Sequence, residues 1–408
     1  MILQRTRYLE RIRKYYESNL IKVLTGVRRC GKSILLNQIK NEILSKNEID
    51  ESHVISLNFE DVAYDNLRSF QKLNAFLVQK IKDEKKYYIF LDEIQHVRQF
   101  EKVLSSLKAT QNVSIFVTGS NSKLLSGRLA TLLVGRCKEF KIMPFTYSEF
   151  VEFHRQNGIE LPTKPLQNYL RYGGMPQRID YSEEEDIKGY LESVFYGIID
   201  KDICNATSKI KRETFLTLSK YIIENVGKEF SPESVAASYN QANANETIYK
   251  ENIYRCLEKL EQACLISRVK RYDVPSKRTL KKIEKQYVVD NGLTLACSDS
   301  NRIFASRALE NAIYNELIVR GYEVKIGKTY KGEIDFVVMK NGKKCFIQVA
   351  YLLSDETVLE REFSAFSSLK DSSPKFVLSL DDFDMSHDGI THLNAEDFLL
   401  GKAEIYLN

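Results

Sequence analysis

Residues 26–33 have the types and the spacing of a phosphate-binding loop. They read GVRRCGKS and match the pattern G-x-x-x-x-G-K-[ST] in full. Gly26 and Gly31 permit the backbone angles that turn amide groups inward, so that these amides and the start of a helix cradle phosphates. Lys32 would reach the β- and γ-phosphates of ATP, and the Ser33 hydroxyl would bind Mg²⁺. The alternative is a glycine turn that caps a helix, which the strand before the loop and the helical pattern after it disfavour.

The remaining residues of the loop add charge and a thiol. Arg28 and Arg29 either supply positive charge near the phosphates or point to solvent, and we favour solvent or an interdomain contact for one of them. Cys30 is expected to fill a small space rather than to act as a reactive thiol. The residues predicted to surround the nucleotide are Gly26, Val27, Arg28, Arg29, Cys30, Gly31, Lys32 and Ser33.

Two adjacent carboxylates follow an apolar run and form the second candidate for chemistry. Residues 88–91 read YIFL, and Asp92 and Glu93 come directly after them. Ligands of open α/β sheets bind at the carboxyl ends of the strands, which is where this pair is delivered. Asp92 would hold Mg²⁺ through water, and Glu93 would polarise the water that attacks the γ-phosphate.

Polar and basic residues further along the chain could complete such a site. Residues 117–122 read VTGSNS, and Asn121, with Ser120 as second choice, could orient the attacking water. The alternative for this run is an ordinary turn with a helix cap. Arg128 and Arg136 could each stabilise transition-state charge, within the chain or across a subunit interface, and the alternative for each is an arginine at the solvated surface.

Strand and helix signals alternate through the first 150 residues or so and position these groups. Short apolar runs separated by helical patterns are typical of a buried parallel sheet. The strands are predicted at 21–25, 54–59, 88–91, 114–118 and 137–143. A helix over 33–44 would follow the phosphate-binding loop, and the carboxylate pair would end the third strand.

Several motifs in one order resemble a known family. GVRRCGKS, NFED at 58–61, FLDEIQHV, VTGSNS, MPFTYSEF, YLRYGGMP and VVDNGL follow one another, and the likeness covers essentially the whole chain. The sequence resembles the prokaryotic AAA-type ATPases that join a P-loop domain to a C-terminal domain of unknown function. The resemblance implies an α/β fold with an AAA-like P-loop NTPase domain, a helical and winged-helix middle region, and a restriction-endonuclease-like α/β domain. It also implies Arg136 as the arginine of the ATP site, within the chain or across a subunit interface.

The expected domain boundaries lie near residues 155, 210 and 295. The predicted segments are an AAA-type ATPase domain (1–155), a helical lid or linker (156–210), a winged-helix-like region (211–295) and a degenerate endonuclease-like domain (296–408). Within the last two segments we expect a hairpin, a helix and three strands, at 266–272 with 282–289, at 306–320, and at 324–326, 333–340 and 343–351.

The C-terminal hairpin places polar residues of three elements together. Its Asn-Gly turn at 341–342 is a strong two-residue turn signal, and counting outward from it puts Asp335 opposite Gln348, with Cβ atoms about 5 Å apart. With Glu310 on the preceding helix, the arrangement resembles the PD-(D/E)xK site of nucleases, where carboxylates hold Mg²⁺ and a lysine activates water.

Two departures from that nuclease pattern argue against cleavage. The position of the lysine is occupied by Ala350, and the neutral Gln348 weakens binding of a cation that prefers charged oxygen ligands. Lys331 would lie on the same face of the hairpin, some rungs away. We therefore expect an endonuclease-like fold that serves as a docking module or as a structural element, without efficient cleavage.

A strongly basic segment lies outside the predicted ATP site. Residues 268–285 contain eight basic and two acidic residues, a local balance of +6 in a chain whose net charge is +5. On the wing of a winged helix this segment would follow the phosphates of DNA, with Tyr272 available to stack on a base. The alternative is a solvated hairpin whose charges discourage edge-to-edge pairing.

Composition excludes several classes of protein. The chain has 408 residues, of which 43% are apolar and 28% charged, so it can build real cores and is not a disordered chain. Its seven cysteines are scattered without a CxxC pair, which predicts a reducing, cytoplasmic location and no structural zinc. No apolar run reaches about 18 residues, so we expect no membrane partner.

These observations predict an enzyme, a P-loop ATPase. ATP and Mg²⁺ would be bound at the loop, and hydrolysis would drive movement of C-terminal modules that dock DNA, through residues 268–285, or a protein partner; a homo-oligomer is also open. One alternative is a slow, nucleotide-switched regulator that binds DNA or protein. The other is an ATP-regulated nuclease.

Overall fold

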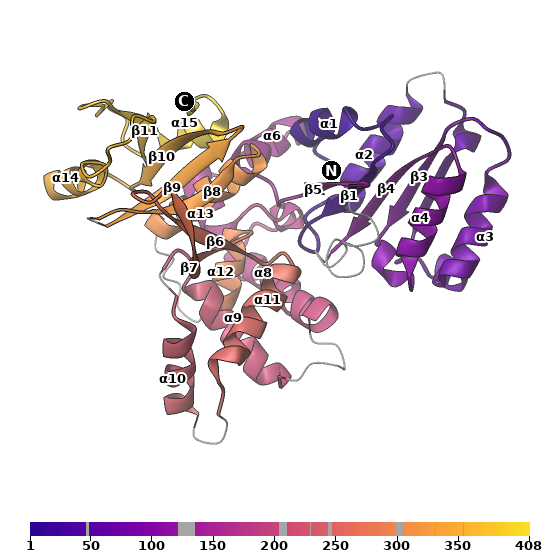
Figure 1. Ribbon diagram of the computed structural model, residues 1–408, viewed down its shortest axis with the longest axis horizontal. Coiled ribbons are helices and arrows are strands. Elements are labelled where there is room, and N and C mark those ends of the chain that lie inside the picture. Colours follow the sequence, from indigo (N-terminus) through magenta and orange to yellow (C-terminus); the bar gives the residue numbers. More distant parts are fainter. Residues whose placement is uncertain are drawn as a thin grey trace. The chain divides into compact units, whose positions relative to one another are not determined.

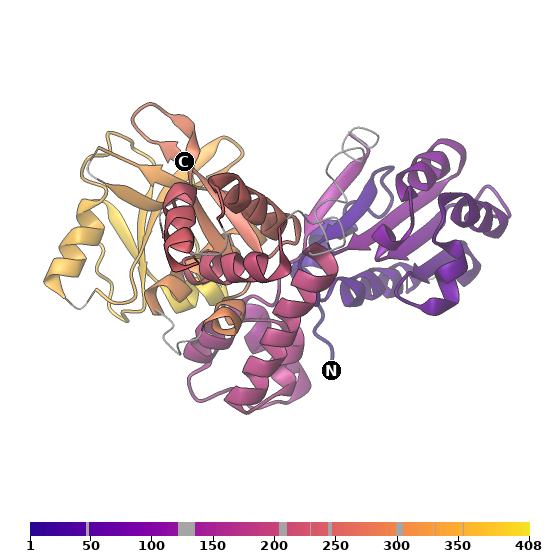
Figure 2. The same ribbon diagram turned by 90° about the horizontal axis from the view of Figure 1, so that it is seen from below.

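The structure, a computed structural model, comprises two compact units, residues 1–142 with 262–264 and residues 143–261 with 265–408. It describes residues 1–45, 49–120, 135–203, 210–228, 230–243, 247–298, 305–330, 332–353 and 355–408, and only the backbone of 280–283. Each unit has its own sheet (Figure 1, Figure 2). The division into four segments predicted from the sequence stays a prediction.

The first unit is built on five parallel strands in the order β2-β3-β4-β1-β5. The strands are β1 (Ile21–Thr25), β2 (Val54–Asn58), β3 (Tyr87–Asp92), β4 (Val113–Gly119) and β5 (Cys137–Lys141). The helices of this unit are α1 (Thr6–Arg13), α2 (Lys32–Leu44), α3 (Phe70–Lys80) and α4 (Phe100–Thr110). All five predicted strands and the helix after the loop are confirmed, within a residue or two at each end.

Helices cover both faces of this sheet, which explains why its strands are apolar throughout. In β1, Val23 joins the core formed with α3 and α4, while Leu24 is buried on the opposite face, where α2 packs. Figure 1 shows α3 and α4 together on one side of the strands and α2 on the other. Because every position of β1, β3 and β4 is buried, a continuous apolar run is what such strands require.

The strand registers define two opposite edges of the sheet. At the carboxyl edge, Thr25 of β1 pairs with Gly119 of β4, and Leu91 of β3 pairs with Val117 of β4. At the amino edge, Ile21 of β1 pairs with Cys137 of β5. A group after β1 or β3 and a group before β5 are therefore separated by the length of a strand, roughly 16 Å for five residues.

The second unit is mixed α/β, with a seven-stranded sheet in the order β12-β11-β10-β9-β8-β6-β7. Its strands are β6 (Ile266–Asp273), β7 (Arg278–Val288), β8 (Glu323–Lys328), β9 (Glu333–Lys340), β10 (Lys343–Val349), β11 (Lys375–Ser379) and β12 (Ile390–Asn394). Its helices are α6 (Tyr147–Asn157), α7 (Pro165–Tyr172), α8 (Glu184–Ile198), α9 (Arg212–Glu224), α10 (Pro232–Ala242), α11 (Lys250–Gln262), α12 (Asn291–Cys297), α13 (Ala305–Val319), α14 (Glu356–Ser364) and α15 (Ala395–Leu400).

The basic hairpin is part of this sheet. The strands β6 and β7 follow the helices α9, α10 and α11, and β6 pairs in parallel with β8 through residues 271–273. One face of the sheet shares a core with α6, α7, α13 and α15, and α14 packs against the other. The hairpin therefore extends the C-terminal sheet, a long-range pairing that the local pattern of residues 266–289 did not reveal.

Two of the sequence motifs, YLRYGGMP and VVDNGL, meet in the second unit. The Asp290 carboxylate accepts hydrogen bonds from the amide of Gly174, at 2.7 Å, and of Gly292, at 2.9 Å. A Cβ on Gly174 would lie 2.0 Å from the carbonyl oxygen of Phe145. Burial raises the pKa of Asp290 to about 6, and Arg178 opposes that shift. The glycines are needed here because the backbones approach too closely for a side chain.

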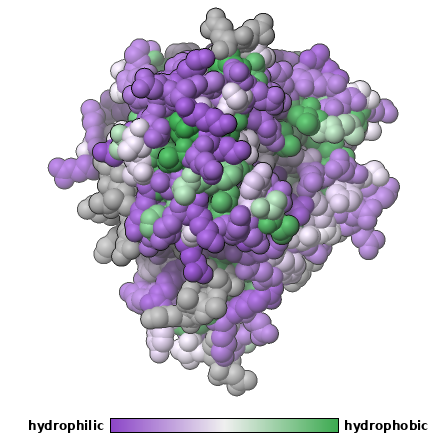
Figure 3. Space-filling view, turned by 90° about the vertical axis from the view of Figure 1, so that its right-hand side faces the viewer, coloured by the Kyte–Doolittle hydropathy of each residue, from purple (hydrophilic) through white to green (hydrophobic). Residues whose placement is uncertain are grey.

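The surface of the protein is mostly hydrophilic on the side shown in Figure 3, with apolar residues in small groups between charged ones. Among the described residues, no helix is both long and apolar enough to cross a membrane.

Candidate functional site

The phosphate-binding loop lies between β1 and α2, as predicted (Figure 1). Gly26 has φ +154° and Gly31 has φ +97°, a region that side chains disfavour. A Cβ on Gly26 would lie 2.2 Å from the carbonyl oxygen of Ile142, so this position also lacks room for one. The two glycines are thus required for different reasons, close approach at Gly26 and a left-handed helix cap at Gly31.

Lys32 is buried and points back over the loop. Its side chain amine donates hydrogen bonds to the carbonyl oxygens of Gly26 and Val27, both at 3.1 Å. Its Nζ also lies 3.9 Å from Oε1 of Glu93. The lysine of the first motif and a carboxylate of the second are therefore in contact, although 61 positions separate them in the chain.

Asp92 and Glu93 end β3 at the carboxyl edge and are almost fully buried, with 6% and 7% of their surface exposed. Burial raises the pKa of the Asp92 carboxyl, and the hydroxyl groups of Thr118 and of Ser33, the last residue of the loop, oppose that shift.

Thr118 connects the two carboxylate positions and was missed in the sequence. Its hydroxyl donates to Oδ1 of Asp92 and accepts from the backbone amide of Glu93, at 2.9 Å. The signal is present in the sequence, since residue 118 is the polar last residue of the strand predicted at 114–118. Because β4 lies between β1 and β3, its end faces both motifs.

Gln95 holds the side chain of Glu93. Its amide nitrogen donates to Oε2 of Glu93 and lies 3.3 Å from Oγ of Ser120. Ser120, the second choice for a water-orienting residue, is thereby linked to the glutamate. Asn121, the first choice, lies outside the described residues, as do Ser122 and Arg128.

Arg136 is placed at the edge of the sheet opposite to the loop. It precedes β5, and its carbonyl oxygen accepts a hydrogen bond from the amide of Ile21, at 2.8 Å, at the beginning of β1. The structure therefore does not bring Arg136 to the loop of its own chain. Its predicted role stays a prediction for the site of a second chain.

The other loop residues have local partners. Arg28 forms an ion pair with Glu60, at 2.7 Å, while Arg29 is exposed and has φ +65°. The Cys30 thiol is buried and donates to the carbonyl oxygen of Ile142, at 3.3 Å, and burial raises its pKa. These contacts agree with the expectation that Cys30 fills a small space.

Arg5 is a second residue that sequence reasoning missed. Its guanidinium is buried, with 2% of the residue exposed, and donates to the carbonyl oxygen of Cys30, at 3.2 Å. Its backbone amide donates to the Gln38 side chain of α2, at 3.2 Å, and Gln38 in turn donates to the carbonyl oxygen of Leu3, at 2.6 Å. The N-terminal segment is thus bound to both the loop and the helix after it, and no motif spacing announces this contact.

The donor set fits magnesium and a nucleoside triphosphate. A loop of this kind, followed at once by α2, suits an anion because backbone amides and a helix N-terminus attract negative charge, and Lys32 supplies a buried positive charge. Ser33 and Asp92 offer oxygen atoms, the ligands that Mg²⁺ prefers. Glu93 lies beside them as a candidate base. Such a set can bind phosphates and direct a water molecule at them.

The predicted nuclease-like residues of the second unit also come together. The backbone amide of Asp335 donates to the Gln348 side chain, at 3.1 Å, and the amide of Val349 donates to Oδ2 of Asp335, at 2.8 Å, which confirms the predicted pairing. Glu310 lies on α13. Lys285 of β7, one of the residues of the basic segment, lies between the carboxylates of Glu310 and Asp335. Lys331 lies outside the described residues.

The basic segment is less available than its charge suggests. Arg268 pairs with Glu284, at 2.6 Å, Arg271 pairs with Glu333, at 2.6 Å, and Lys285 is buried. The prediction that Tyr272 could stack on a base is wrong, because this ring is packed in the core between the sheet and α14, with 9% exposed. Among the side chains of the segment that the structure describes, the exposed basic residues are Lys270, Lys277 and Arg278.

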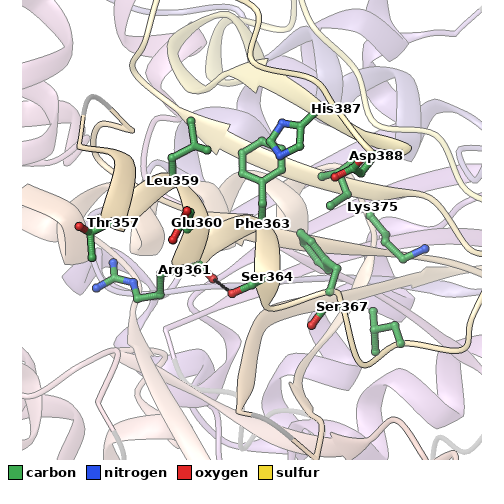
Figure 4. A pocket seen from close by; sticks show the side chains of 13 residues that line it. Thr357, Leu359, Glu360, Arg361, Phe363, Ser364, Ser367, Lys375, His387 and Asp388 are labelled. Atoms are coloured by element: carbon green, nitrogen blue, oxygen red, sulfur yellow. Dashed lines mark hydrogen bonds between the residues drawn. The ribbon is translucent and has the colours of Figure 1, made fainter.

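A hollow of about 790 Å³ opens beside α14 (Figure 4). The rings of Phe363 and His387 stack at its centre, with centroids 4.0 Å apart. Arg361 on its rim pairs with Glu362, at 2.6 Å. No function is assigned to this hollow.

Comparison with known proteins agrees with this geometry. Residues 18–151 match the family described as an AAA domain, and residues 163–302 match a domain of unknown function (DUF8612). An uncharacterized protein of Haemophilus influenzae is 32% identical over 408 residues, which cover 98% of this chain and 99% of that protein. An uncharacterized protein of Methanocaldococcus jannaschii is 31% identical over 370 residues, 86% of this chain and 79% of that protein.

A weaker likeness is found among solved structures. The Aeropyrum pernix ORC2 protein, in ADPNP–ADP complexes, aligns with a TM-score of 0.36 at 11% identity, over 77% of this chain and 91% of that chain. The bacterial relative is similar over nearly its full length, and the AAA-domain match covers the loop and the carboxylate pair. The chain therefore belongs to the prokaryotic family of AAA-type P-loop proteins that carry a C-terminal domain of unknown function.

Proposed function

We propose that this protein binds ATP with Mg²⁺ at the loop of residues 26–33 and hydrolyses it. One observation carries the proposal: Nζ of Lys32 lies 3.9 Å from Oε1 of Glu93, so the phosphate-binding loop and the candidate base share one site. A loop that only capped a helix would have no need of a buried carboxylate pair beside its lysine.

Each residue has a role that follows from its position. The loop amides and Lys32 bind the phosphates, and Lys32 balances charge on the transferred phosphoryl group. Ser33 and Asp92 would hold Mg²⁺, which supplies charge neutralisation for the β- and γ-phosphates when bound. Glu93 orients and polarises the attacking water, and accepts its proton as the new bond forms.

The contacts of Glu93 suggest an order of events. Its carboxylate is held by Lys32 on one side and by Gln95 on the other. Lys32 is shared among Glu93 and two loop carbonyls. Phosphate binding would draw the ammonium away from Glu93, since a phosphate group carries more charge than a carboxylate. Glu93 would then be released to act on water only when nucleotide is present.

Release of phosphate from ATP tests the proposal directly. The wild-type chain is compared with Lys32→Ala and Glu93→Gln, and with Glu51→Gln as a matched control at an exposed site before β2. We expect loss of turnover in the first two variants and wild-type turnover in the control. Equal rates in all four chains would refute the proposal. The same assay with added DNA tests whether DNA is a partner that stimulates turnover.

The restrained Glu93 side chain favours one second candidate, a nucleotide switch that hydrolyses slowly. In that case the chemical step itself would be slow, because Glu93 is not released to act on water, and ATP would stay bound. Equilibrium binding and single-turnover hydrolysis of ATP separate the two: tight binding with single-turnover hydrolysis too slow to matter indicates a switch, whereas fast single-turnover hydrolysis indicates an ATPase.

The placement of Arg136 leads to a proposal about assembly. Because it lies at the amino edge of the sheet, it could contact the phosphates only of a neighbouring chain. Mixing the Glu93→Gln and Arg136→Ala variants tests this. Activity that recovers on mixing, through sites that combine an intact Glu93 and a neighbour's intact Arg136, supports an oligomeric ATPase. Additive, unrecovered rates would argue against a shared site.

A further inference from the structure

Lys285 is buried at the centre of a group of partly buried carboxylates in the second unit. Only 5% of its surface is exposed, and its Nζ lies 2.7 Å from Oε1 of Glu333, 3.1 Å from Oε1 of Glu310 and 4.0 Å from Oδ1 of Asp335. The four residues come from β7, β9 and α13. We call Lys285, Glu310, Glu333, Asp335 and Gln348 the Lys285 cluster.

The carboxylates of the cluster are held in place by other donors. The Tyr287 hydroxyl donates to Oε1 of Glu310, at 2.7 Å, and Arg271 donates to Oε2 of Glu333, at 2.6 Å. The Gln348 side chain oxygen is already used by the backbone amide of Asp335, at 3.1 Å. Each carboxylate of the cluster thus has a second hydrogen-bond donor, and the negative charges face one ammonium group and one guanidinium group.

The sequence predicts a nuclease-like arrangement of carboxylates here, yet the cluster does not fit a metal ion. Mg²⁺ requires oxygen ligands at about 2.0–2.1 Å in near-octahedral geometry. A cation that approached Glu310 and Glu333 so closely would lie beside the ammonium group, which already sits within hydrogen-bonding distance of both. With the ammonium group in its place, no group of three His, Cys, Asp or Glu side chains among the described residues has an arrangement that could hold a metal.

We propose that the ammonium group of Lys285 occupies the place of the divalent cation that these carboxylates would otherwise need, so that the Lys285 cluster binds no metal ion. The carboxylates then serve to tie the hairpin of β6 and β7 to α13 and β9, instead of catalysing cleavage. A buried pair of this kind is costly to break, since removal of one partner leaves uncompensated charge in the interior. The neighbouring carboxylates raise the pKa of Lys285, although burial opposes the charged form.

Counting bound Mn²⁺ by electron paramagnetic resonance tests the replacement. All chains are full length, free of nucleotide, and carry Asp92→Asn so that the ATP site contributes no metal binding. We expect no Mn²⁺ at the cluster with Lys285 present, one Mn²⁺ per chain with Lys285→Ala, and loss of that ion in Lys285→Ala with Asp335→Asn. The matched control is Lys344→Ala, which removes a lysine paired with the single carboxylate of Asp371, at 2.6 Å, and should bind no Mn²⁺.

Several results would overturn the proposal. One is Mn²⁺ bound in the presence of Lys285 and lost on Asp335→Asn; another is a folded Lys285→Ala chain that binds none. Cutting of DNA that depends on Mg²⁺ or Mn²⁺ and is abolished by Asp335→Asn would also refute it. Should Lys285→Ala not fold without metal, it is refolded with Mn²⁺: recovery of the native circular dichroism supports the replacement, and failure to recover it counts against it.

Discussion

The hydroxyl of Thr118 should control the protonation of Asp92, and replacing it by a methyl group tests the site most sharply. Thr118 is fully buried at the end of β4; it donates to Oδ1 of Asp92 and accepts from the amide of Glu93, at 2.9 Å. Thr118→Val keeps the shape of the side chain and removes both hydrogen bonds. Thr118→Ser is the matched control, because it keeps the hydroxyl.

The size of the effect follows from the charge of Asp92. A hydrogen bond to a charged group contributes about 1.5–3 kcal/mol, and 1.36 kcal/mol corresponds to about one pKa unit. Thr118 lowers the pKa of Asp92 against the opposing effect of burial. Its loss should therefore raise that pKa further. Because Asp92 must be ionised to hold Mg²⁺, turnover on the acid limb of the pH profile should fall by about 10-fold to 100-fold, the factor that corresponds to this hydrogen-bond energy.

The pH profile of phosphate release is the measurement. In Thr118→Val the acid limb should move to higher pH, and turnover should recover partly as pH rises, whereas Thr118→Ser should follow the wild type. A folded Thr118→Val chain with unchanged turnover and an unchanged acid limb would refute the assignment of Thr118 and, with it, the role of Asp92. A loss that does not depend on pH would indicate that the amide of Glu93, and not Asp92, is what Thr118 positions.

Three further predictions concern buried groups of both units. Lys22 is fully buried, and burial, with help from nearby lysines, lowers its pKa to about 7. Between pH 7 and the ordinary pKa of lysine, the unfolded chain therefore binds a proton that the folded chain does not. The free energy of unfolding should rise with pH in this range, by up to about 1.4 kcal/mol per pH unit. Lys22→Met should remove this slope, as measured by urea titrations at pH 7 and pH 9. If the two slopes agree, the lysine is not buried as described. Gly174→Ala, whose new Cβ would lie 2.0 Å from the carbonyl of Phe145, should cost about 3 kcal/mol by thermal unfolding, whereas Gly189→Ala, with open space around it, should be neutral or slightly stabilising. Arg5→Met should weaken binding of a fluorescent ATP analogue by about 10-fold, the equivalent of one hydrogen bond to the loop, and leave the saturated turnover rate unchanged; an unaltered affinity would show that the loop keeps its shape without Arg5.

Local chemistry made the first unit largely predictable. A loop that must surround phosphates needs glycine at positions such as Gly26, and strands covered on both faces must be apolar throughout, as β1 and β3 are. Both requirements restrict the residue types within a short stretch of chain, so they are visible in the local sequence. The end of β3 then places Asp92 and Glu93, and adjacency in sequence is enough to locate them.

Contacts between residues that are far apart in the sequence were not predictable in the same way. Arg5 reaches the loop from 25 positions away. The distance between Arg136 and the loop depends on the direction of β5 beside β1, which the sequence does not state. Each of these contacts is made by a common residue type in an ordinary local pattern, so nothing in the pattern distinguishes it from a surface arginine.

Net charge is the property for which the sequence is most misleading. A balance of +6 over residues 268–285 suggests a surface for a polyanion, but a count of charges does not say which of them face solvent. Arg271 of β6 and Lys285 of β7 both pair with Glu333 of β9, so neither charge is available to a polyanion. If the Lys285 cluster holds the hairpin against the rest of the unit, the basic residues of the segment 268–285 are of two kinds. Some stabilise the fold through ion pairs, and others, such as Lys270, are exposed to solvent. Lys270→Ala should then reduce the salt dependence of any DNA binding and leave the free energy of unfolding unchanged. Lys285→Ala should lower the free energy of unfolding and leave the salt dependence of DNA binding unchanged.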